Sequence, residues 1–191
     1  MRRTHRFALP SLALLLALSA AAPPAAAGEL AGVELPDAAT VGGEKLVLNG
    51  MGLRKKLFVK VYVAGLYLPA KQSDGKKVLA ADTPRRTVMH FLYDVDRQKM
   101  CDAWDDALEG NVARPAAELV SQFETLCSWM QDVEKGQRMT YTYEPGEGTT
   151  VEVAGKTKGT IPGKAFADAL WSAWIGAKPA TTDLRDGLLG G

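Results

Sequence analysis

Cysteine and histidine, the residues most often used for metal binding and nucleophilic or acid–base chemistry, are scarce in this sequence. It contains two cysteines, which form no Cys-x-x-Cys motif, and two histidines. One histidine is His5, so His90 has no second histidine or cysteine at metal-ligand spacing. The Gly-x-Ser-x-Gly motif of serine hydrolases is also missing. We therefore expect neither a metal site nor a cofactor, and we interpret His90 as a half-buried structural residue rather than a general base.

A strong charge of either sign is missing too, since 23 lysines and arginines nearly balance 22 aspartates and glutamates. Residues 1–27 hold three arginines and no acid, so without them the formal net charge falls from +1 to −2. A mildly acidic chain is not expected to bind nucleic acid through its bulk charge. The 47% hydrophobic and 24% charged composition is that of an ordinary globular protein, and the length suits one domain.

A long apolar run occurs only near the N-terminus, where it has the features of a secretory signal peptide. Three arginines precede an apolar segment at residues 12–22, which is too short to span a bilayer comfortably. An alanine triplet that ends at Ala27 then offers a small-residue cleavage site. We therefore predict a signal peptide at residues 1–27 and a single domain at residues 28–191, located in the periplasm or secreted.

Outside the signal peptide, no hydrophobic run approaches the roughly 18 residues of a transmembrane helix, so we expect no stable membrane insertion after its removal. An exported chain meets an oxidising environment, in which Cys101 and Cys127 can pair. They fall in two predicted helices at similar distances from a turn at residues 111–115, so an antiparallel hairpin would place them nearly level. The alternatives are a disulfide and two separately buried thiols.

The strongest strand pattern covers residues 57–68, where β-branched and aromatic residues recur with few breakers. One face of this strand, from Leu57 to Tyr67, is wholly uncharged and is expected to face the core. The opposite face carries Lys60 and Tyr62 among apolar residues, as expected of a surface that lines a cleft or meets a helix. The Gly50-Met51-Gly52 segment before it predicts a turn, with positive φ angles or close backbone approach.

The remaining pattern predicts strands followed by a helical pair, a further antiparallel meander and helices near the C-terminus. Predicted strands are residues 33–35, 44–48, 85–93, 137–144, 149–153 and 156–161; predicted helices are a short one within 73–82, then 94–109, 115–131, 164–174 and 182–189. This order is typical of an α+β fold in which helices cover one face of a mostly antiparallel sheet.

Three motifs resemble the chalcone isomerase-like family, especially its bacterial secreted members. They are the Gly-x-Gly-Leu-Arg segment with the following Phe-Val-Lys-Val-Tyr-Val-Ala-Gly-Leu-Tyr-Leu strand, Gly159-Thr160-Ile161-Pro162-Gly163, and Trp174-Ile175-Gly176. The resemblance covers nearly all the chain after residue 27. It implies the chalcone isomerase-like open-faced β-sandwich, whose ligand cleft lies between long strands and helices.

The resemblance implies two functions that differ in class. In the enzymes of this family, an arginine from the glycine-rich segment stabilises the substrate's negative charge during an intramolecular addition, and Arg54 matches it. The family's polar partners fall on Tyr62, close to Asp96 and Ala103, and near Ala173, so most of that polar set is missing. Noncatalytic members resemble fatty-acid-binding proteins, in which the arginine and a tyrosine hold a carboxylate.

We therefore expect an exported, noncatalytic binder of a small amphipathic anion, such as a fatty acid or a phenolic acid. Arg54 and Tyr62 are the predicted head-group ligands, and Phe58, Phe123 and Met130 are the predicted apolar wall. The alternative is an isomerase, an intramolecular lyase of chalcone isomerase type, with Arg54 as its catalytic residue. Ligand identity, oligomeric state and pathway stay open at this point.

Overall fold

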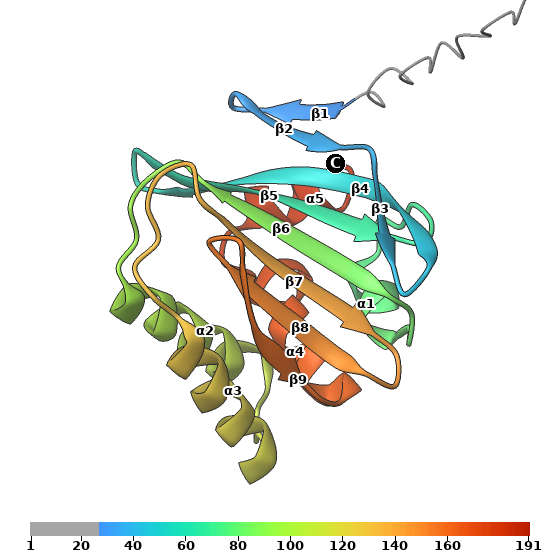
Figure 1. Ribbon diagram of the computed structural model, residues 1–191, viewed down its shortest axis with the longest axis vertical. Helices are drawn as coiled ribbons and strands as arrows, with labels where there is room; N and C mark the ends of the chain where they lie inside the picture. The colour runs from blue at the N-terminus through green and yellow to red at the C-terminus, as the bar shows by residue number, and fades with distance from the viewer. Residues whose placement is uncertain (1–26) are drawn as a thin grey trace, which may run out of the picture.

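The computed structural model describes residues 27–191, and the predicted signal peptide lies outside them except for Ala27. A seven-stranded antiparallel sheet runs in simple sequence order from β3 to β9, and a separate two-stranded hairpin, β1–β2, precedes it (Figure 1). The strands are β1 (Ala27–Leu30), β2 (Val33–Pro36), β3 (Ala38–Val41), β4 (Glu44–Lys56), β5 (Val59–Leu68), β6 (Arg85–Phe91), β7 (Arg138–Glu144), β8 (Gly148–Val153) and β9 (Lys156–Ile161). This confirms the predicted α+β class and its mostly antiparallel sheet.

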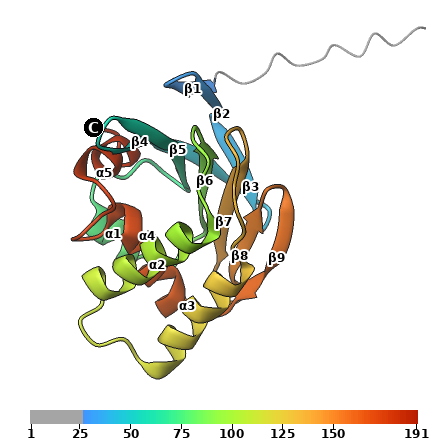
Figure 2. The same ribbon diagram turned by 90° about the vertical axis from the view of Figure 1, so that its left-hand side faces the viewer.

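Five helices accompany the sheet in the described part of the chain. They are α1 (Gly75–Ala80), α2 (Arg97–Asn111), α3 (Ala117–Trp129), α4 (Lys164–Ile175) and α5 (Thr182–Leu188). Figure 2 shows α2, α3 and α4 on one side of the curled sheet. Asp96 caps α2 by accepting a hydrogen bond from the backbone N–H of Lys99 at 2.8 Å. The helix predicted to begin at Pro115 begins two residues later, since α3 starts at Ala117.

The glycine-rich segment is not a turn, contrary to the sequence prediction. Gly50 and Gly52 lie inside β4, which continues to Lys56, and neither has a positive φ. The other part of the prediction, close backbone approach, does apply: a Cβ on Gly52 would lie 2.3 Å from the carbonyl oxygen of Leu184 in α5. The missing side chains therefore let α5 lie directly on β4.

Both faces of β5 are buried, and the larger core lies on the face that carries Tyr62. This core fills the space between the sheet and the helices and includes Ala64, Leu66 and Leu68 from β5. The opposite face, predicted to be the core face, packs Val63 against Val33 and Leu35 of the β1–β2 hairpin. The prediction was wrong about which face meets the larger core, because alternation shows that both faces are apolar but not which layer covers each.

A disulfide joins Cys101 in α2 to Cys127 in α3, with their Cα atoms 5.1 Å apart. The structure thus contains one of the two arrangements that the cysteine spacing allowed. In the chain-entropy description, closing a loop of this length stabilises the folded state by about 3.5 kcal/mol. The bond fixes α2, which forms one wall of the cleft described below, to its neighbour α3.

A buried arginine at the start of β6 connects the sheet to α4. Arg85 is 1% exposed, and its Nη2 lies 2.6 Å from Oδ1 of Asp168 in α4. Its Nη1 donates to the carbonyl oxygen of Val78, and its guanidinium lies 5.0 Å from the ring centroids of both Tyr143 and Trp171. The charge is therefore held by one carboxylate and two aromatic faces.

None of the helices within residues 27–191 is long and apolar enough to cross a membrane.

Candidate functional site

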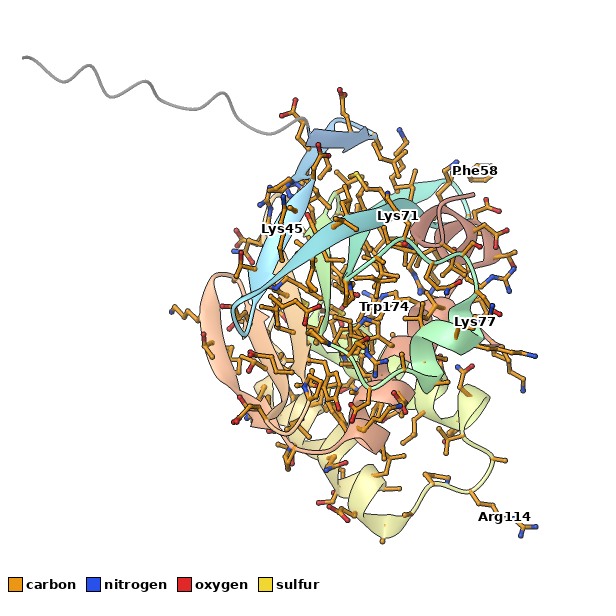
Figure 3. All side chains as sticks on the ribbon, turned by 90° about the vertical axis from the view of Figure 1, so that its right-hand side faces the viewer. Lys45, Phe58, Lys71, Lys77, Arg114 and Trp174 are labelled. Carbon is orange, nitrogen blue, oxygen red and sulfur yellow. A yellow bond between two sulfur atoms is a disulfide. The ribbon has the colours of Figure 1, made fainter. Side chains whose placement is uncertain are left out.

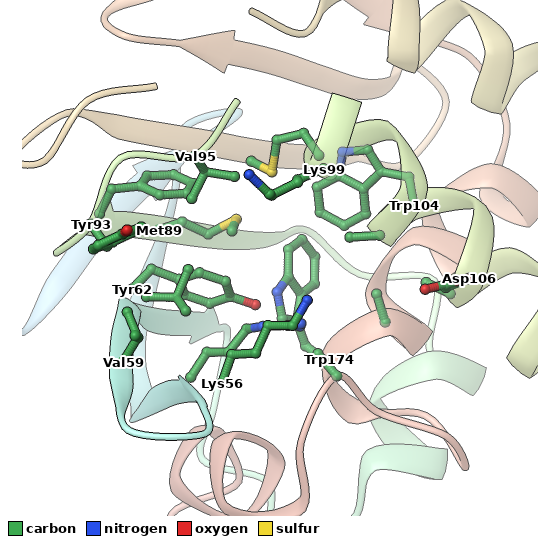
Figure 4. Close-up of a pocket in the computed structure, with 18 of the residues that line it drawn as sticks. Lys56, Val59, Tyr62, Met89, Tyr93, Val95, Lys99, Trp104, Asp106 and Trp174 are labelled. Atoms are coloured by element: carbon green, nitrogen blue, oxygen red, sulfur yellow. The ribbon is translucent and has the colours of Figure 1, made fainter. Parts of the chain in front are cut away.

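A cleft of about 590 Å³ opens between the β4–β5 hairpin, the end of β6, α2 and the segment around the end of α4. Figure 4 shows it with side chains entering from these separate elements. The sheet supplies its wall from β5 and β6, while α2 and α4 supply aromatic and small residues. The cleft thus lies where the fold predicted from the sequence resemblance would have one.

The inner part of the cleft is apolar. Its large side chains are Tyr62, Met89, Phe91, Met100, Trp104 and Trp174, each no more than 6% exposed. Trp104 and Trp174 contact each other edge to face with ring centroids 5.6 Å apart, and each packs at 5.5 Å against Tyr141 beneath them. Such interlocked rings form a rigid wall that can hold a hydrocarbon tail without rearranging.

The mouth of the cleft is positively charged. Four cations line it, namely Arg54, Lys56, Lys99 and Lys178, against two acids, Asp94 and Asp106. Lys99 is paired with Asp96 next to it. Figure 4 shows Lys56 and Lys99 entering the same space from the hairpin and from α2. An anionic group is therefore favoured at the mouth while its apolar part lies inside.

Arg54 and Tyr62 are opposite each other in the β4–β5 register, which brings both predicted head-group ligands to this cleft. Within residues 27–191, no carboxylate lies within ion-pair distance of the half-buried Arg54. Burial raises the pKa of Tyr62 above its usual value, and the nearby Arg54 and Trp174 offset only part of that effect. Tyr62 is therefore a neutral hydroxyl at physiological pH, and Figure 4 shows it directed toward Trp174.

The predicted apolar wall was wrong at three positions. Phe58 is fully exposed at the tip of the β4–β5 hairpin, as Figure 3 shows, and does not line the cleft. Phe123 is 1% exposed and packs against Phe166 at 5.3 Å, in the core between α3 and α4. Met130 is likewise buried in the core outside the cleft. Residue type alone did not show which apolar side chains face the ligand space.

The two tryptophans of the cleft, Trp104 and Trp174, were not among the predicted site residues. Both lie in helices that were predicted from the sequence, Trp104 in α2 and Trp174 near the end of α4. The signal for Trp174 was its position directly before the Ile-Gly pair of the family motif. For Trp104 the signal was weaker, since it adjoins Ala103, the position of a missing polar partner.

Two of the positions at which the resemblance predicted missing polar groups lie in the cleft, whereas Asp96 does not line it and caps α2. Ala103 of α2 and Ala173 of α4 both line it, and each presents only a methyl group. The inner cleft has few neutral polar groups. Within residues 27–191 they are the hydroxyl of Tyr62 and the indole N–H groups of the two tryptophans. The site can therefore hold an anion, but it has few groups with which to orient a reacting substrate.

His90 lies on β6 outside this cleft. Its Nδ1 accepts a hydrogen bond from Nε of Arg138 at 3.2 Å. Partial burial and the charge of Arg138 lower the pKa of His90 below its usual value. The half-buried structural role predicted for this residue agrees with that environment.

Two comparisons with known proteins bear on the fold. The sequence profile described as chalcone isomerase-like matches residues 27–190. The crystal structure of a fatty-acid binding protein from Arabidopsis thaliana has a TM-score of 0.62 to this structure, with 17% sequence identity. That alignment covers 83% of this chain and 92% of the plant chain, and at this identity it shows a common fold.

No curated protein sequence is similar enough to this chain to count as a match. The family assignment therefore depends on the sequence profile, which spans nearly all the described residues, and the structural likeness agrees with it. Together with the cleft beside Arg54, they lead to one conclusion: this chain belongs to the chalcone isomerase-like family.

Proposed function

We propose that this protein is a noncatalytic binder of an amphipathic anion, such as a fatty acid, in the cleft beside Arg54. The carboxylate would lie against the guanidinium of Arg54 and the hydroxyl of Tyr62. The hydrocarbon tail would lie along Met89, Trp104 and Trp174. A cleft of about 590 Å³ has the size usual for sites that enclose small ligands.

The observation that carries this proposal is an arginine at the mouth of an apolar cleft that has no carboxylate partner within residues 27–191. A half-buried guanidinium binds a carboxylate with two charge-assisted hydrogen bonds, which are stronger than hydrogen bonds between neutral groups. The neutral Tyr62 hydroxyl can donate a third. The name of the structural neighbour, a fatty-acid binding protein, supports the same ligand class, although only the fold is shared at 17% identity.

The side chains around Arg54 favour binding over isomerisation. Cyclisation of a chalcone-type substrate needs its reacting atoms held in one geometry by several polar contacts. Ala103 and Ala173 supply none at the positions where the resemblance predicted them. An arginine and a tyrosine remain, and these are sufficient for binding a carboxylate.

Replacing Arg54 with alanine is expected to weaken the binding of a long-chain fatty acid such as palmitate by about 10- to 100-fold. This range corresponds to the loss of a hydrogen bond to a charged group, about 1.5–3 kcal/mol. Isothermal titration of the delipidated protein measures the effect. The corresponding fatty alcohol should bind equally to both proteins, because it has no charge for Arg54 to hold.

The matched control is Arg114→Ala, which removes an exposed arginine far from the cleft, between α2 and α3 (Figure 3). It should leave the affinity for palmitate unchanged. Equal palmitate affinities for the wild type and Arg54→Ala would refute the proposed carboxylate site. Turnover of a chalcone by the wild type, lost in Arg54→Ala, would instead support the isomerase.

We also propose that the protein is exported, with residues 1–27 removed as a signal peptide. The support is the order of arginines, apolar segment and alanine triplet in the sequence, together with a disulfide, which is stable in oxidising compartments. N-terminal sequencing of the protein from its native host should begin close to Gly28. A native protein that begins at Met1 would contradict the proposal.

A further inference from the structure

The tip of the β4–β5 hairpin exposes two large apolar side chains completely or nearly so. Phe58 is 100% exposed, Leu57 is 88% exposed, and Val59 next to them is 39% exposed. Tyr93, which lines the mouth of the same cleft, is 55% exposed. Of the five large hydrophobic residues that are exposed within residues 27–191, four thus lie in the hairpin tip or at the cleft mouth. Figure 3 shows Phe58 projecting from the molecule.

The turn itself is unfavourable for the folded chain on its own. Lys56 and Val59 are paired in the register, so Leu57 and Phe58 form a two-residue turn. Leu57 has a φ of 54°, in the left-handed region where Asn or Gly is preferred in such turns. A strained backbone that presents apolar side chains to water contributes nothing to folding. Backbone strain of this kind is concentrated at functional sites.

Lysines surround the apolar tip. Lys55, Lys56 and Lys60 are all exposed, and no acid occurs in the sequence between Glu44 and Asp74. None of the three forms an ion pair within the described residues. The hairpin therefore combines a small apolar tip with a concentrated positive charge.

We propose that this hairpin docks on the surface of an anionic phospholipid membrane. Leu57 and Phe58 would enter the boundary between head groups and acyl chains, and the lysines would contact the lipid phosphates. A tip of two side chains is much smaller than the surface that a stable protein–protein interface buries. A bilayer, in contrast, accepts shallow apolar insertion, and its negative surface complements the three lysines. The docking is peripheral and requires no membrane-spanning segment.

The docked orientation has a consequence for the cleft. Lys56, Leu57 and Val59 belong both to the hairpin tip and to the cleft lining, so a docked hairpin places the cleft mouth at the lipid surface. An amphipathic anion could then pass between the bilayer and the cleft without crossing bulk water. This exchange step rests on the proposed ligand binding, whereas the docking itself does not.

Cosedimentation of the protein, without residues 1–27, with vesicles tests the docking. We expect binding to vesicles made of equal parts phosphatidylglycerol and phosphatidylcholine, and little binding to phosphatidylcholine alone. Phe58→Ser should weaken the binding about tenfold through the loss of apolar insertion. Phe58→Leu, which keeps an apolar side chain, should retain most of it. The double variant Lys55→Ser with Lys60→Ser should weaken it about 25-fold, near fivefold for each lysine.

Lys45→Ser is the matched control, because Lys45 is an exposed lysine on β4 far from the hairpin tip (Figure 3). It should bind anionic vesicles like the wild type. Equal binding of Phe58→Ser and the wild type would overturn the proposal, as would equal binding to both kinds of vesicle. So would a Phe58-dependent dimer that does not bind vesicles, since the tip would then be an interface between two copies.

The two proposals can fail separately. Phe58 does not line the cleft, so Phe58→Ser should keep the palmitate affinity of the wild type in solution. Arg54→Ala should reduce that affinity while the vesicle binding remains within about fivefold of the wild type, the effect of one cation. A protein that binds vesicles but not palmitate would keep the docking and remove the proposed ligand.

Discussion

Replacing Asp168 with alanine is expected to lower the free energy of unfolding by about 3 kcal/mol or more. Asp168 holds the charge of Arg85, which is 1% exposed, through a contact of 2.6 Å. Without it, a guanidinium would stay buried with only the two aromatic faces and one carbonyl oxygen as partners. The Nε of Arg85 already has no hydrogen-bond partner among the described residues, so little compensation is available.

Urea unfolding followed by tryptophan fluorescence measures this loss. The control is Asp186→Ala, which removes an exposed carboxylate paired with Arg185 and should cost less than about 1 kcal/mol. Replacing both Arg85 and Asp168 with apolar residues, as in Arg85→Met with Asp168→Leu, should cost less than Asp168→Ala alone, because no buried charge is left without a partner. Lys164, which also pairs with Asp168, is 30% exposed and can be solvated by water. Equal midpoints for Asp168→Ala and Asp186→Ala would show that the buried ion pair contributes little.

Replacing Gly52 with alanine is expected to destabilise the protein by about 3 kcal/mol, the upper range for overpacking. The added Cβ would lie 2.3 Å from the carbonyl oxygen and 2.9 Å from a methyl group of Leu184. The carbonyl belongs to the backbone of α5, so the contact is relieved only when the helix moves away from β4. Arg54 lies two residues farther along the same strand, and a shift of β4 should also weaken ligand binding.

The comparison for Gly52→Ala is Gly110→Ala in α2, where a Cβ would meet only Lys178 at 3.6 Å. Alanine is about 1 kcal/mol better than glycine inside a helix, so this variant should be slightly more stable than the wild type. Unfolding midpoints and hydrogen exchange of the α5 amides measure both effects. Unchanged exchange in α5 for Gly52→Ala would contradict the assigned role of this glycine.

Asp168 and Gly52 matter for function because they position the walls of the cleft. The Arg85–Asp168 pair fixes α4 against β6, and α4 carries Trp174 and Ala173 into the cleft. The close approach at Gly52 fixes β4 under α5 and so sets the position of Arg54. The disulfide between α2 and α3 restrains the third wall. A cleft held in this way is largely preformed, which reduces the entropic cost of binding.

Sequence patterns predicted the strands and helices well where hydrophobic periodicity was long and uninterrupted. They were less accurate at the β4–β5 connection, where the turn was expected before residue 57 and the structure has it at Leu57-Phe58. The glycines had suggested a turn because glycine is common in turns. Here their small size serves helix packing, a long-range requirement that local sequence does not record.

The sequence alone determined the α+β class, the order of most strands and helices along the chain, the facing cysteines and the choice of Arg54 as the candidate head-group ligand. Each of these depends on local periodicity, on spacing along the chain or on a family motif, all of which can be read in one dimension. Tertiary structure alone decided that Trp104 and Trp174 line the cleft, that Phe123 and Met130 fill the core, and that Phe58 faces water. The physical reason is that an apolar side chain is equally suited to a core, a ligand cleft or a membrane surface, and only the packing of distant elements determines which of these it meets.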